Sequence, residues 1–141
     1  MVLGKLSHRM MQVNVRPAFL LAQRVAPGMC ERRWGRILLI SSVAAFTGGV
    51  VGPHYAASKA AQLGLMHSLA GILAPYGVTV NALAPAMIAG GMTLPGDAAQ
   101  LQQYAARIPV GRLGKTEEVA EAAFSLIANP FVTAQTLLVD G

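Results

Sequence analysis

Residues 35–44 read Gly-Arg-Ile-Leu-Leu-Ile-Ser-Ser-Val-Ala and contain an unbroken apolar run at 37–40. An apolar run without polar alternation is typical of a strand that is buried on both faces, as in a parallel sheet. A second run, Val-Thr-Val-Asn-Ala-Leu, occupies 78–83 and is followed by Pro85, and Thr-Leu-Leu-Val at 136–139 is a third. Helical patterns separate these runs. The alternation predicts βαβ units and therefore an α/β fold with a parallel sheet.

Four helices are expected beside these strands, at about residues 7–29, 55–74, 97–107 and 116–128. Pro17 lies inside the first helix and predicts either a kink or a later true start. Asp97 can cap the third helix, and Thr116 can cap the fourth, which has Glu117 and Glu118 in its positive first turn. Only three strands are visible, so the pattern predicts part of a doubly wound sheet rather than a whole one.

The composition is that of one globular domain. The chain has 141 residues, of which 54% are apolar and 12% are charged, so it can bury a core. The formal net charge is +5, but the basic residues are scattered, and the only tight group, Arg32, Arg33 and Arg36, lacks interleaved aromatic residues. A nucleic-acid partner is therefore not expected, because such surfaces concentrate positive charge in a patch or stripe.

Cysteine usage and hydropathy exclude further classes of protein. Cys30 is the only cysteine, which excludes an internal disulfide and a cysteine-based zinc site, and no metal is expected. Residues 60–96 carry no charge, but glycines and prolines interrupt them, so no window offers the roughly 20 continuous apolar residues of a membrane span. Nothing at the amino terminus resembles a signal peptide. We expect a soluble, cytoplasmic protein without a membrane partner.

Tyr55 and Lys59 are four residues apart on a predicted helix, so their side chains share one face. A phenol has a pKa of about 10 and is a poor base at neutral pH, but a nearby ammonium stabilises the phenolate form. Such a pair could exchange a proton with a substrate. The spacing is common by chance, and the alternative is an interfacial tyrosine beside a solvated lysine.

Ser42 lies 13 residues before Tyr55, at the carboxyl end of the strand predicted at 37–40. Ligands bind outside the carboxyl ends of strands in open α/β sheets, so the Ser42 hydroxyl is expected where a substrate would lie. The alternative is a polar strand-end residue that satisfies loop backbone. Asn14 lies 28 residues before Ser42 on the first predicted helix, and its alternative is an interior polar residue bonded to backbone.

Asn14, Ser42, Tyr55 and Lys59 together resemble the active-site tetrad of the short-chain dehydrogenase/reductase family. The similarity continues, in the family's order and spacing, through Val-Asn-Ala-Leu-Ala-Pro at 80–85, Ile-Pro-Val-Gly-Arg-Leu-Gly at 108–114 and Gln-Thr-Leu-Leu-Val-Asp-Gly at 135–141. Among family branches, these stretches are most similar to the 3-oxoacyl-[acyl-carrier-protein] reductase type. The resemblance implies a partial Rossmann-like doubly wound parallel sheet. It also implies NAD(P)-dependent interconversion of a carbonyl and a secondary alcohol by hydride transfer.

The resemblance implies a role for each residue of the tetrad. Tyr55 would be the general acid/base for the substrate oxygen, and Ser42 would hold that oxygen by a hydrogen bond. Lys59 would favour the Tyr55 phenolate and bind the nicotinamide ribose, and Asn14 would fix a water in the proton relay behind Lys59. The residues that would contact the cofactor, NAD or NADP, are Tyr55, Lys59, Pro85, Ala86 and Ile88. The substrate would be a small carbonyl compound or alcohol.

The cofactor-anchoring part of the family is missing from this chain. Members begin with a strand, a glycine-rich turn and a helix whose amino terminus binds the pyrophosphate. No such glycine fingerprint occurs here, and the glycine-rich loop at 48–52 belongs to the family's substrate region instead. Ala86 and Gly90 stand where the family usually has Gly and Thr, so nicotinamide placement is expected to differ. The choice between NAD and NADP cannot be read.

Residues 1–141 therefore resemble the carboxyl-terminal catalytic part of such a domain, without the amino-terminal dinucleotide-binding part. The strand at 37–40 would be central in a full sheet but is an apolar edge here, and such an edge is a predicted aggregation site. A truncated or mis-started gene product is the simplest explanation. The loop from Met87 to Asp97 is expected to cover the substrate, whose identity the sequence does not specify.

The alternative function is that of an inactive family fragment acting as an oligomerisation or interaction module. One side of the Tyr55–Ala74 helix carries small residues at three- and four-residue spacing: Ala57, Ala60, Ala61, Gly64, Ser68 and Gly71. Small residues let another helix approach closely. This side either packs against the chain's own sheet or forms the interface of a homodimer or homotetramer, which the family resemblance favours.

Overall fold

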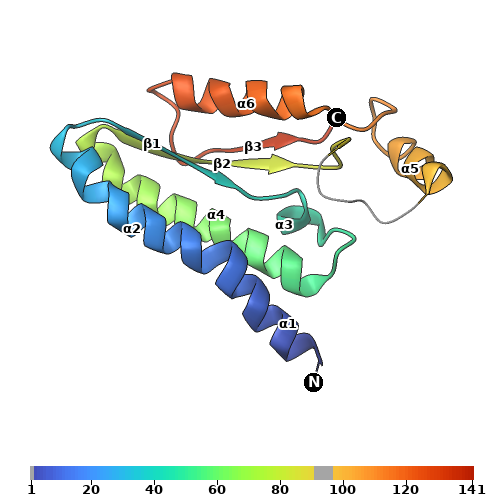
Figure 1. The fold of residues 1–141 in the computed structure, drawn as a ribbon. Coiled ribbons are helices and arrows are strands. Elements are labelled where there is room, and N and C mark those ends of the chain that lie inside the picture. The colour runs from blue at the N-terminus through green and yellow to red at the C-terminus, as the bar shows by residue number, and fades with distance from the viewer. Residues whose placement is uncertain (1, 91–96) are drawn as a thin grey trace.

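The structure, a computed structural model, describes residues 2–90 and 97–141. Its centre is a three-stranded sheet in the order β1-β2-β3, formed by Gly35–Ile40, Val78–Pro85 and Thr136–Val139 (Figure 1). The strands are parallel and lie where the sequence predicts them, which confirms the α/β fold class. Part of the loop expected to cover a substrate, at 91–96, lies outside the described residues.

Helices cover both faces of this sheet. On one face lie α1 (Val2–Met10), η1 (Met11–Val15), α2 (Arg16–Glu31) and α4 (Pro53–Leu73), and on the other lies α6 (Thr116–Ala128) (Figure 1). Parallel strands need such crossover connections, because a short turn cannot bring the chain back to the start of the next strand. The carboxyl ends of β1 and β2 therefore point the same way, toward α3 (Ala44–Thr47) and α5 (Ala98–Ala105).

The core centres on β2, whose residues 78–84 are all buried. One apolar cluster joins this strand to β1 and α4, and its buried members are Leu39, Met66, Ala70, Leu73, Val78, Val80 and Ala82. The prediction that the run at 78–83 is a strand buried on both faces is thereby confirmed. Burial of each large side chain in such a cluster contributes about 1.5–3 kcal/mol.

Pro17 widens the first helix instead of ending it. A proline inside a helix lacks the N–H and clashes with the carbonyl four residues before it, here that of Val13. The chain responds with the π turn η1, in which Arg16 N donates to Met11 O across five residues. α1 and α2 continue on both sides of this turn (Figure 1). The helix thus runs from 2 to 31, longer than predicted at both ends, and Asn14 lies in its one irregular turn.

The other helices begin and end close to the predicted residues, with one wrong cap. Asp97 caps α5 as predicted, since its carboxylate accepts from Gln100 N at 3.0 Å. Thr116 is not the cap of α6, because the helix already includes it and Lys115 is the N-cap residue. The Glu118 carboxylate accepts from the Lys115 N–H at 2.7 Å, which satisfies that terminus without a threonine hydroxyl. α3 is not predicted by the sequence.

α4 ends in a turn that a glycine closes, and the residue types in this segment are the only sign of the turn in the sequence. The 3₁₀ turn η2 (Ala74–Tyr76) follows the helix, and Gly77 closes it with a φ of +76°. A Cβ at this position would collide with the Arg33 carbonyl, so only glycine fits both the backbone angle and the space. This turn sets the point at which β2 begins.

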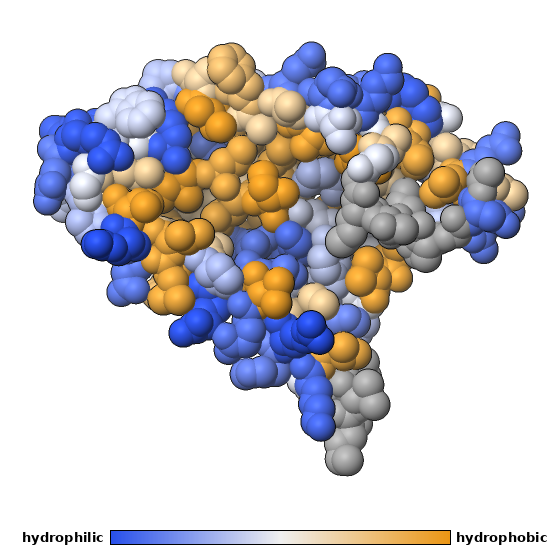
Figure 2. Space-filling view, in the orientation of Figure 1, coloured by the Kyte–Doolittle hydropathy of each residue, from blue (hydrophilic) through white to orange (hydrophobic). Residues whose placement is uncertain are grey.

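β1 lies at the edge of the sheet in the part of the chain that the structure describes, as the three predicted strands lead one to expect. Its ladder runs to β2 on one side, with Gly35 opposite Val78 and Ile40 opposite Leu83. Among the described residues, no strand lies on its other side. Figure 2 shows an apolar surface between α6 and α2, where β1 lies. Ile40 contributes to the exposed apolar surface, since 48% of it is accessible.

An exposed ion pair fastens the segment after α5 to the first turn of α6. Arg112 binds Glu118 through two hydrogen bonds, Nη1 to Oε2 at 2.9 Å and Nη2 to Oε1 at 2.6 Å. The Arg112 guanidinium, and then the Lys115 backbone N–H, lower the pKa of Glu118 from its usual 4.5 to about 2. The contact with Glu118 raises the pKa of Arg112 in turn.

Met66→Ala tests the core. Met66 is fully buried in the cluster between α4 and β2, so its truncation should cost about 2–5 kcal/mol of unfolding free energy, measured by urea denaturation. Met66→Leu keeps nearly the same volume and should cost less than about 1.5 kcal/mol. Ile72→Ala on the exposed side of the same helix is the control. Equal losses at 66 and 72 would contradict this assignment of the core.

Glu118→Gln tests the ion pair through its pH dependence. A carboxyl whose folded-state pKa is lowered stabilises the fold above its unfolded-state pKa, and this stabilisation is lost as the pH falls from about 4.5 to about 2. The variant should therefore be less stable than the wild type at pH 7, and the difference in urea midpoint should disappear near pH 2. Glu121→Gln on the same helix is the control. A difference that is constant with pH would refute the prediction.

Candidate active site

A cleft of about 860 Å³ lies at the carboxyl ends of β1 and β2. Ser42 enters it from the segment after β1, and Tyr55 and Lys59 enter it from the first turns of α4. The residues expected to touch a cofactor, Pro85, Ala86 and Ile88, line the same cleft. The structure thus brings together three residues of the predicted tetrad and the predicted cofactor-contacting loop.

Ser42 combines the two interpretations that its position allows. Its Oγ accepts a hydrogen bond from the Ala44 N–H at 3.2 Å, at the start of α3. The hydroxyl therefore satisfies loop backbone, as the structural alternative expects. Because the oxygen is the acceptor in this bond, the O–H can still donate into the cleft that Ser42 lines.

Tyr55 and Lys59 lie together, as their spacing predicts. The Lys59 Nζ is 5.7 Å from the centroid of the Tyr55 ring. The ammonium also donates to the backbone carbonyl of Ile40 at 2.7 Å. Partial burial lowers the pKa of Lys59 below its usual 10.5, because the charged form loses water.

Asn14 does not line this cleft. Its Nδ2 donates to Ser58 Oγ at 2.9 Å, and Ser58 Oγ donates to the Tyr55 carbonyl at 2.7 Å. Its own backbone carbonyl accepts from Gln62 Nε2 at 2.7 Å. The side-chain Nδ2 and the backbone carbonyl of Asn14 are therefore both hydrogen-bonded, and the residue ties the π turn η1 to two successive turns of α4.

Sequence reasoning missed several residues that shape the site. Ser58 is fully buried and lies three residues after Tyr55, a spacing that could have indicated its role. Ser41 Oγ donates to the Lys59 carbonyl at 2.9 Å, which fastens the end of β1 to α4. Gln62 is 6% exposed, and its Oε1 has no partner among the described residues. Tyr104 and Arg107 reach the cleft from α5 and the turn after it, for which no motif gave a signal.

The residues present fit one end of a nicotinamide cofactor. The cleft lies at the carboxyl ends of parallel strands, and it offers the Lys59 ammonium and the Ser42 hydroxyl as donors for ribose or substrate oxygens. The pyrophosphate end finds no such fit. No described strand leads into a glycine-rich turn followed by a helix of dinucleotide-binding type, because β1 leads through Ser41 and Ser42 into the short helix α3.

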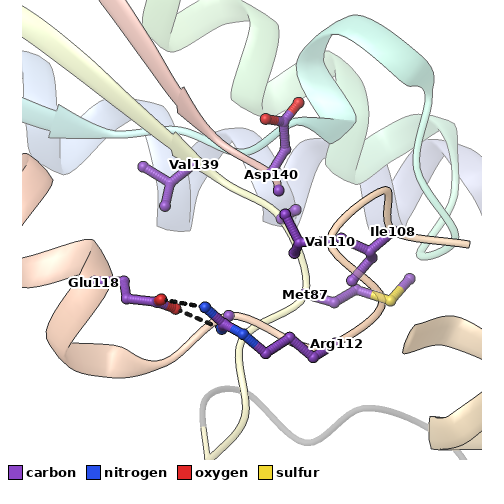
Figure 3. Close-up of a pocket in the computed structure, with 10 residues that line it drawn as sticks. Met87, Ile108, Val110, Arg112, Glu118, Val139 and Asp140 are labelled. Carbon is purple, nitrogen blue, oxygen red and sulfur yellow. Dashed lines mark hydrogen bonds and ion pairs between the residues drawn. The ribbon is translucent and has the colours of Figure 1, made fainter. Parts of the chain in front are cut away.

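A second, smaller hollow of about 240 Å³ lies beside the Arg112–Glu118 pair (Figure 3). Met87, Ile108, Val110 and Val139 make most of its wall apolar. Two of its three charged side chains, Arg112 and Glu118, bind each other, and the third is Asp140. In the part of the chain that the structure describes, no group of three His, Cys, Asp or Glu side chains could hold a metal ion. No described helix is long and apolar enough to cross a membrane.

Comparison with known sequences shows which family the chain matches. The sequence model of the family described as Enoyl-(Acyl carrier protein) reductase matches residues 5–141. The 3-oxoacyl-[acyl-carrier-protein] reductase of Aquifex aeolicus is 40% identical over 133 residues, covering 93% of this chain and 54% of that protein. The L-rhamnose 1-dehydrogenase (NADP(+)) of Thermoplasma acidophilum is 39% identical over 142 residues, covering 96% of this chain and 56% of that protein.

Solved structures agree with the sequence comparison. A 3-oxoacyl-[acyl-carrier protein] reductase from Brucella melitensis superposes with a TM-score of 0.89 at 38% identity, over 94% of this chain and 51% of that one. A second structure from that organism, with bound NAD, gives 0.83 at 39% identity, over 94% and 50%. The chain spans about half the length of the relatives that it matches. With its family match over 5–141 and its parallel α/β sheet, the chain belongs to the short-chain dehydrogenase/reductase family.

Proposed function

We propose that this chain is the catalytic portion of an NAD(P)-dependent oxidoreductase that interconverts a carbonyl and a secondary alcohol by hydride transfer. The observation that carries the proposal is the meeting of Ser42, Tyr55 and Lys59 in one cleft at the carboxyl ends of β1 and β2. Membership in a family of oxidoreductases supports it. The chain spans about half the length of its relatives, so its activity is proposed here and is separate from its membership in the family.

Tyr55 is the proposed general acid/base. In the reductive direction its phenolic O–H gives a proton to the carbonyl oxygen of the substrate, and in the oxidative direction the phenolate takes the proton back. When bound, the reduced nicotinamide supplies the hydride that the carbonyl carbon receives. The Lys59 ammonium, 5.7 Å from the ring centroid, favours the negative charge left on the phenolate.

Ser42 and Asn14 have supporting roles in this proposal. The Ala44 N–H holds the Ser42 oxygen, which leaves the hydroxyl proton free to donate to the substrate oxygen that Tyr55 protonates. A donor fixed in advance against a developing negative charge lowers the barrier without reorganising. Asn14 is a positioning residue, because it reaches the Tyr55 backbone only through Ser58.

The proposed substrate is a small carbonyl compound or alcohol, without a narrower class. The two curated relatives described above are almost equally similar to this chain, yet one is named for 3-oxoacyl-[acyl-carrier-protein] and the other for L-rhamnose. The cofactor is NAD or NADP on the same grounds, since one relative is named for NADP(+) and one solved neighbour holds NAD. Apolar residues line the cleft together with Tyr104 and Arg107, which is compatible with either class of substrate.

Tyr55→Phe tests the proposal. Loss of general acid/base catalysis should lower kcat for a short 3-oxoacyl thioester with NADPH or NADH by about 10²–10⁴-fold, while the phenyl ring keeps the shape of the cleft. Cofactor binding, followed by the fluorescence of the reduced nicotinamide, should change little. Tyr76→Phe is the matched control, because it removes the same hydroxyl beyond the other end of α4, where Tyr76 is 46% exposed.

Two results would contradict this function. One is turnover by Tyr55→Phe at the wild-type rate. The other is a wild-type chain that leaves nicotinamide fluorescence unchanged at sub-millimolar cofactor, which would favour the interaction module instead.

One structural observation favours the alternative function, that of an oligomerisation or interaction module. Along α4, the small residues face away from the chain's own core: Ala57, Ala60, Gly64, Ser68 and Gly71 are exposed, and Ala61 is half-buried. The buried side of the helix carries Ser58, Gln62, Met66, Ala70 and Leu73 instead. A Cβ added at Gly64 or Gly71 would meet nothing within 4 Å. The prediction that the small residues pack on the chain's own sheet is thus wrong. We propose that this side of α4 is the interface of a homo-oligomer.

Gly64→Leu tests that interface. Leucine favours the helix by about 1 kcal/mol over glycine, so the fold should be kept, but its bulk would stop a second helix from approaching. We expect a dimer or tetramer of the wild type to dissociate at least partly in sedimentation velocity. Ala120→Leu on the exposed side of α6 should leave the association unchanged. A wild type that sediments as a monomer at every concentration would overturn the interface.

A further inference from the structure

The cleft of the candidate active site is lined by two cationic side chains and by no carboxylate. The cations are Lys59 and Arg107, and every Asp and Glu of the described residues lies outside the lining. Residues 91–96, which the structure does not describe, contain no Asp or Glu either. A cleft whose charges have one sign attracts ligands of the opposite sign. The charge of this cleft therefore favours an anionic ligand over a neutral one.

Lys59 already has partners inside the protein. Its Nζ donates to Ile40 O at 2.7 Å and lies 5.7 Å from the centroid of the Tyr55 ring. In the proposed function this ammonium serves the Tyr55 phenolate and the nicotinamide ribose. The positive charge that is left for another group of a ligand is that of Arg107.

The Arg107 guanidinium has no partner among the described residues. The side chain is exposed, and the ion pair found in this part of the chain joins Arg112 to Glu118 instead. Residues 91–96 read Gly-Met-Thr-Leu-Pro-Gly and offer no charge that could neutralise it. A cation at the wall of a cleft with no counter-charge of its own is available to an anion that enters the cleft.

Backbone hydrogen bonds hold Arg107 in place at the end of α5. Its N–H donates to Tyr104 O at 3.1 Å, and the next N–H, that of Ile108, donates to Ala105 O at 3.1 Å. α5 lies beyond the carboxyl ends of β1 and β2 and is a different element from α4, which carries Tyr55 (Figure 1). A ligand that reached both Tyr55 and Arg107 would thus be held by two elements at two points.

The remainder of the lining suits the apolar part of such a ligand. Val50, Val51 and Ile108 line the same cleft, whose volume is about 860 Å³. Apolar walls with a few polar groups are typical of small-molecule sites, in which the polar groups determine the orientation of the ligand. A short aliphatic chain between a reacting carbonyl and an anionic end therefore matches the lining.

We propose that Arg107 is a substrate-binding residue, and that the substrate of this site is a carbonyl compound, or its alcohol, that also carries a carboxylate or a phosphate. The planar guanidinium can donate two parallel hydrogen bonds to either anion. The proposal rests on the proposed function, since it names the substrate class of the same site. L-rhamnose, for which one relative is named, carries no anionic group, so this preference would distinguish the chain from that relative.

Binding of matched ligand pairs tests the proposal without catalysis. The carboxylate pair is 5-oxohexanoate and its methyl ester, and the phosphate pair is dihydroxyacetone phosphate and dihydroxyacetone. Dissociation constants come from NMR titration of the 141-residue chain. In at least one pair, the anion should bind about tenfold or more tightly than its neutral partner, and that pair identifies the anion. Equal binding within both pairs would overturn the proposal.

Arg107→Gln assigns the preference to one side chain. It should weaken binding of the preferred anion by about 10–100-fold, the effect of a charged hydrogen bond, and leave the neutral partner unchanged. Arg107→Lys keeps the charge but not the planar fork, and should fall between the two. Arg24→Gln, on an exposed position of α2 outside the cleft, makes the same change in net charge and is the control. Equal weakening by Arg24→Gln and Arg107→Gln would refute the assignment.

Two further measurements separate this proposal from its alternatives. Arg107→Gln should leave the titration of reduced-nicotinamide fluorescence unchanged, and an equal loss for NADH would assign Arg107 to a cofactor phosphate instead. In turnover, Arg107→Gln should raise KM for the anionic substrate alone, whereas Tyr55→Phe should lower kcat for both members of a pair. An anion preference that depends on Arg107 in a chain without turnover would contradict the proposed function and still support the anion-binding role.

Discussion

β2 is buried along almost its whole length, so each of its backbone polar groups must find a partner inside the protein. β1 supplies the partners on one side through a six-residue parallel ladder. β3 is shorter, and the segment before it continues the pairing by other means. Thr133 Oγ1 accepts from Val80 N at 3.1 Å, and Ala134 N donates to Val80 O at 2.8 Å from a left-handed backbone with a φ of +58°. The unusual backbone of Ala134 is thus explained by the needs of the buried strand.

The same constraint positions the cleft. Pairing with β2 continues past the last residue of β1, since Ser41 N donates to Leu83 O and Val43 N donates to Pro85 O, and the chain then turns into α3. Ser42 therefore enters the loop just beyond the sheet, above the amino-terminal turns of α4. Ser41 joins this loop to the Lys59 carbonyl, so strand end and helix are held by a direct contact and not by proximity alone. The site is a consequence of where a hydrogen-bonded ladder stops.

The sequence predicted the strands and the membership of the cleft because both depend on patterns that are local. Apolar runs mark buried strands, and a spacing of four places Tyr55 and Lys59 together on a helix. It could not predict that Lys59 also reaches the Ile40 carbonyl, since this depends on how the fold brings α4 against the end of β1. Nor could it place Asn14, which a proline three residues later moved into a π turn behind Ser58. The cap of α6 was missed because the helix begins one residue earlier, at Thr116, after Lys115, whose N–H donates to the Glu118 carboxylate.

The π turn also determines where the first helix can change in length during evolution. An inserted or deleted residue in a regular α-helix rotates everything beyond it by about 100°, which would swing the side chains of α1 away from α4. A π turn already contains one residue more than a regular turn needs. Deletion of a single residue between Met11 and Val15 would convert it to an ordinary turn while α1 and α2 kept their faces. Homologous sequences should therefore carry their one-residue gaps in this segment, and helices that have lost the residue should also have lost the proline at 17.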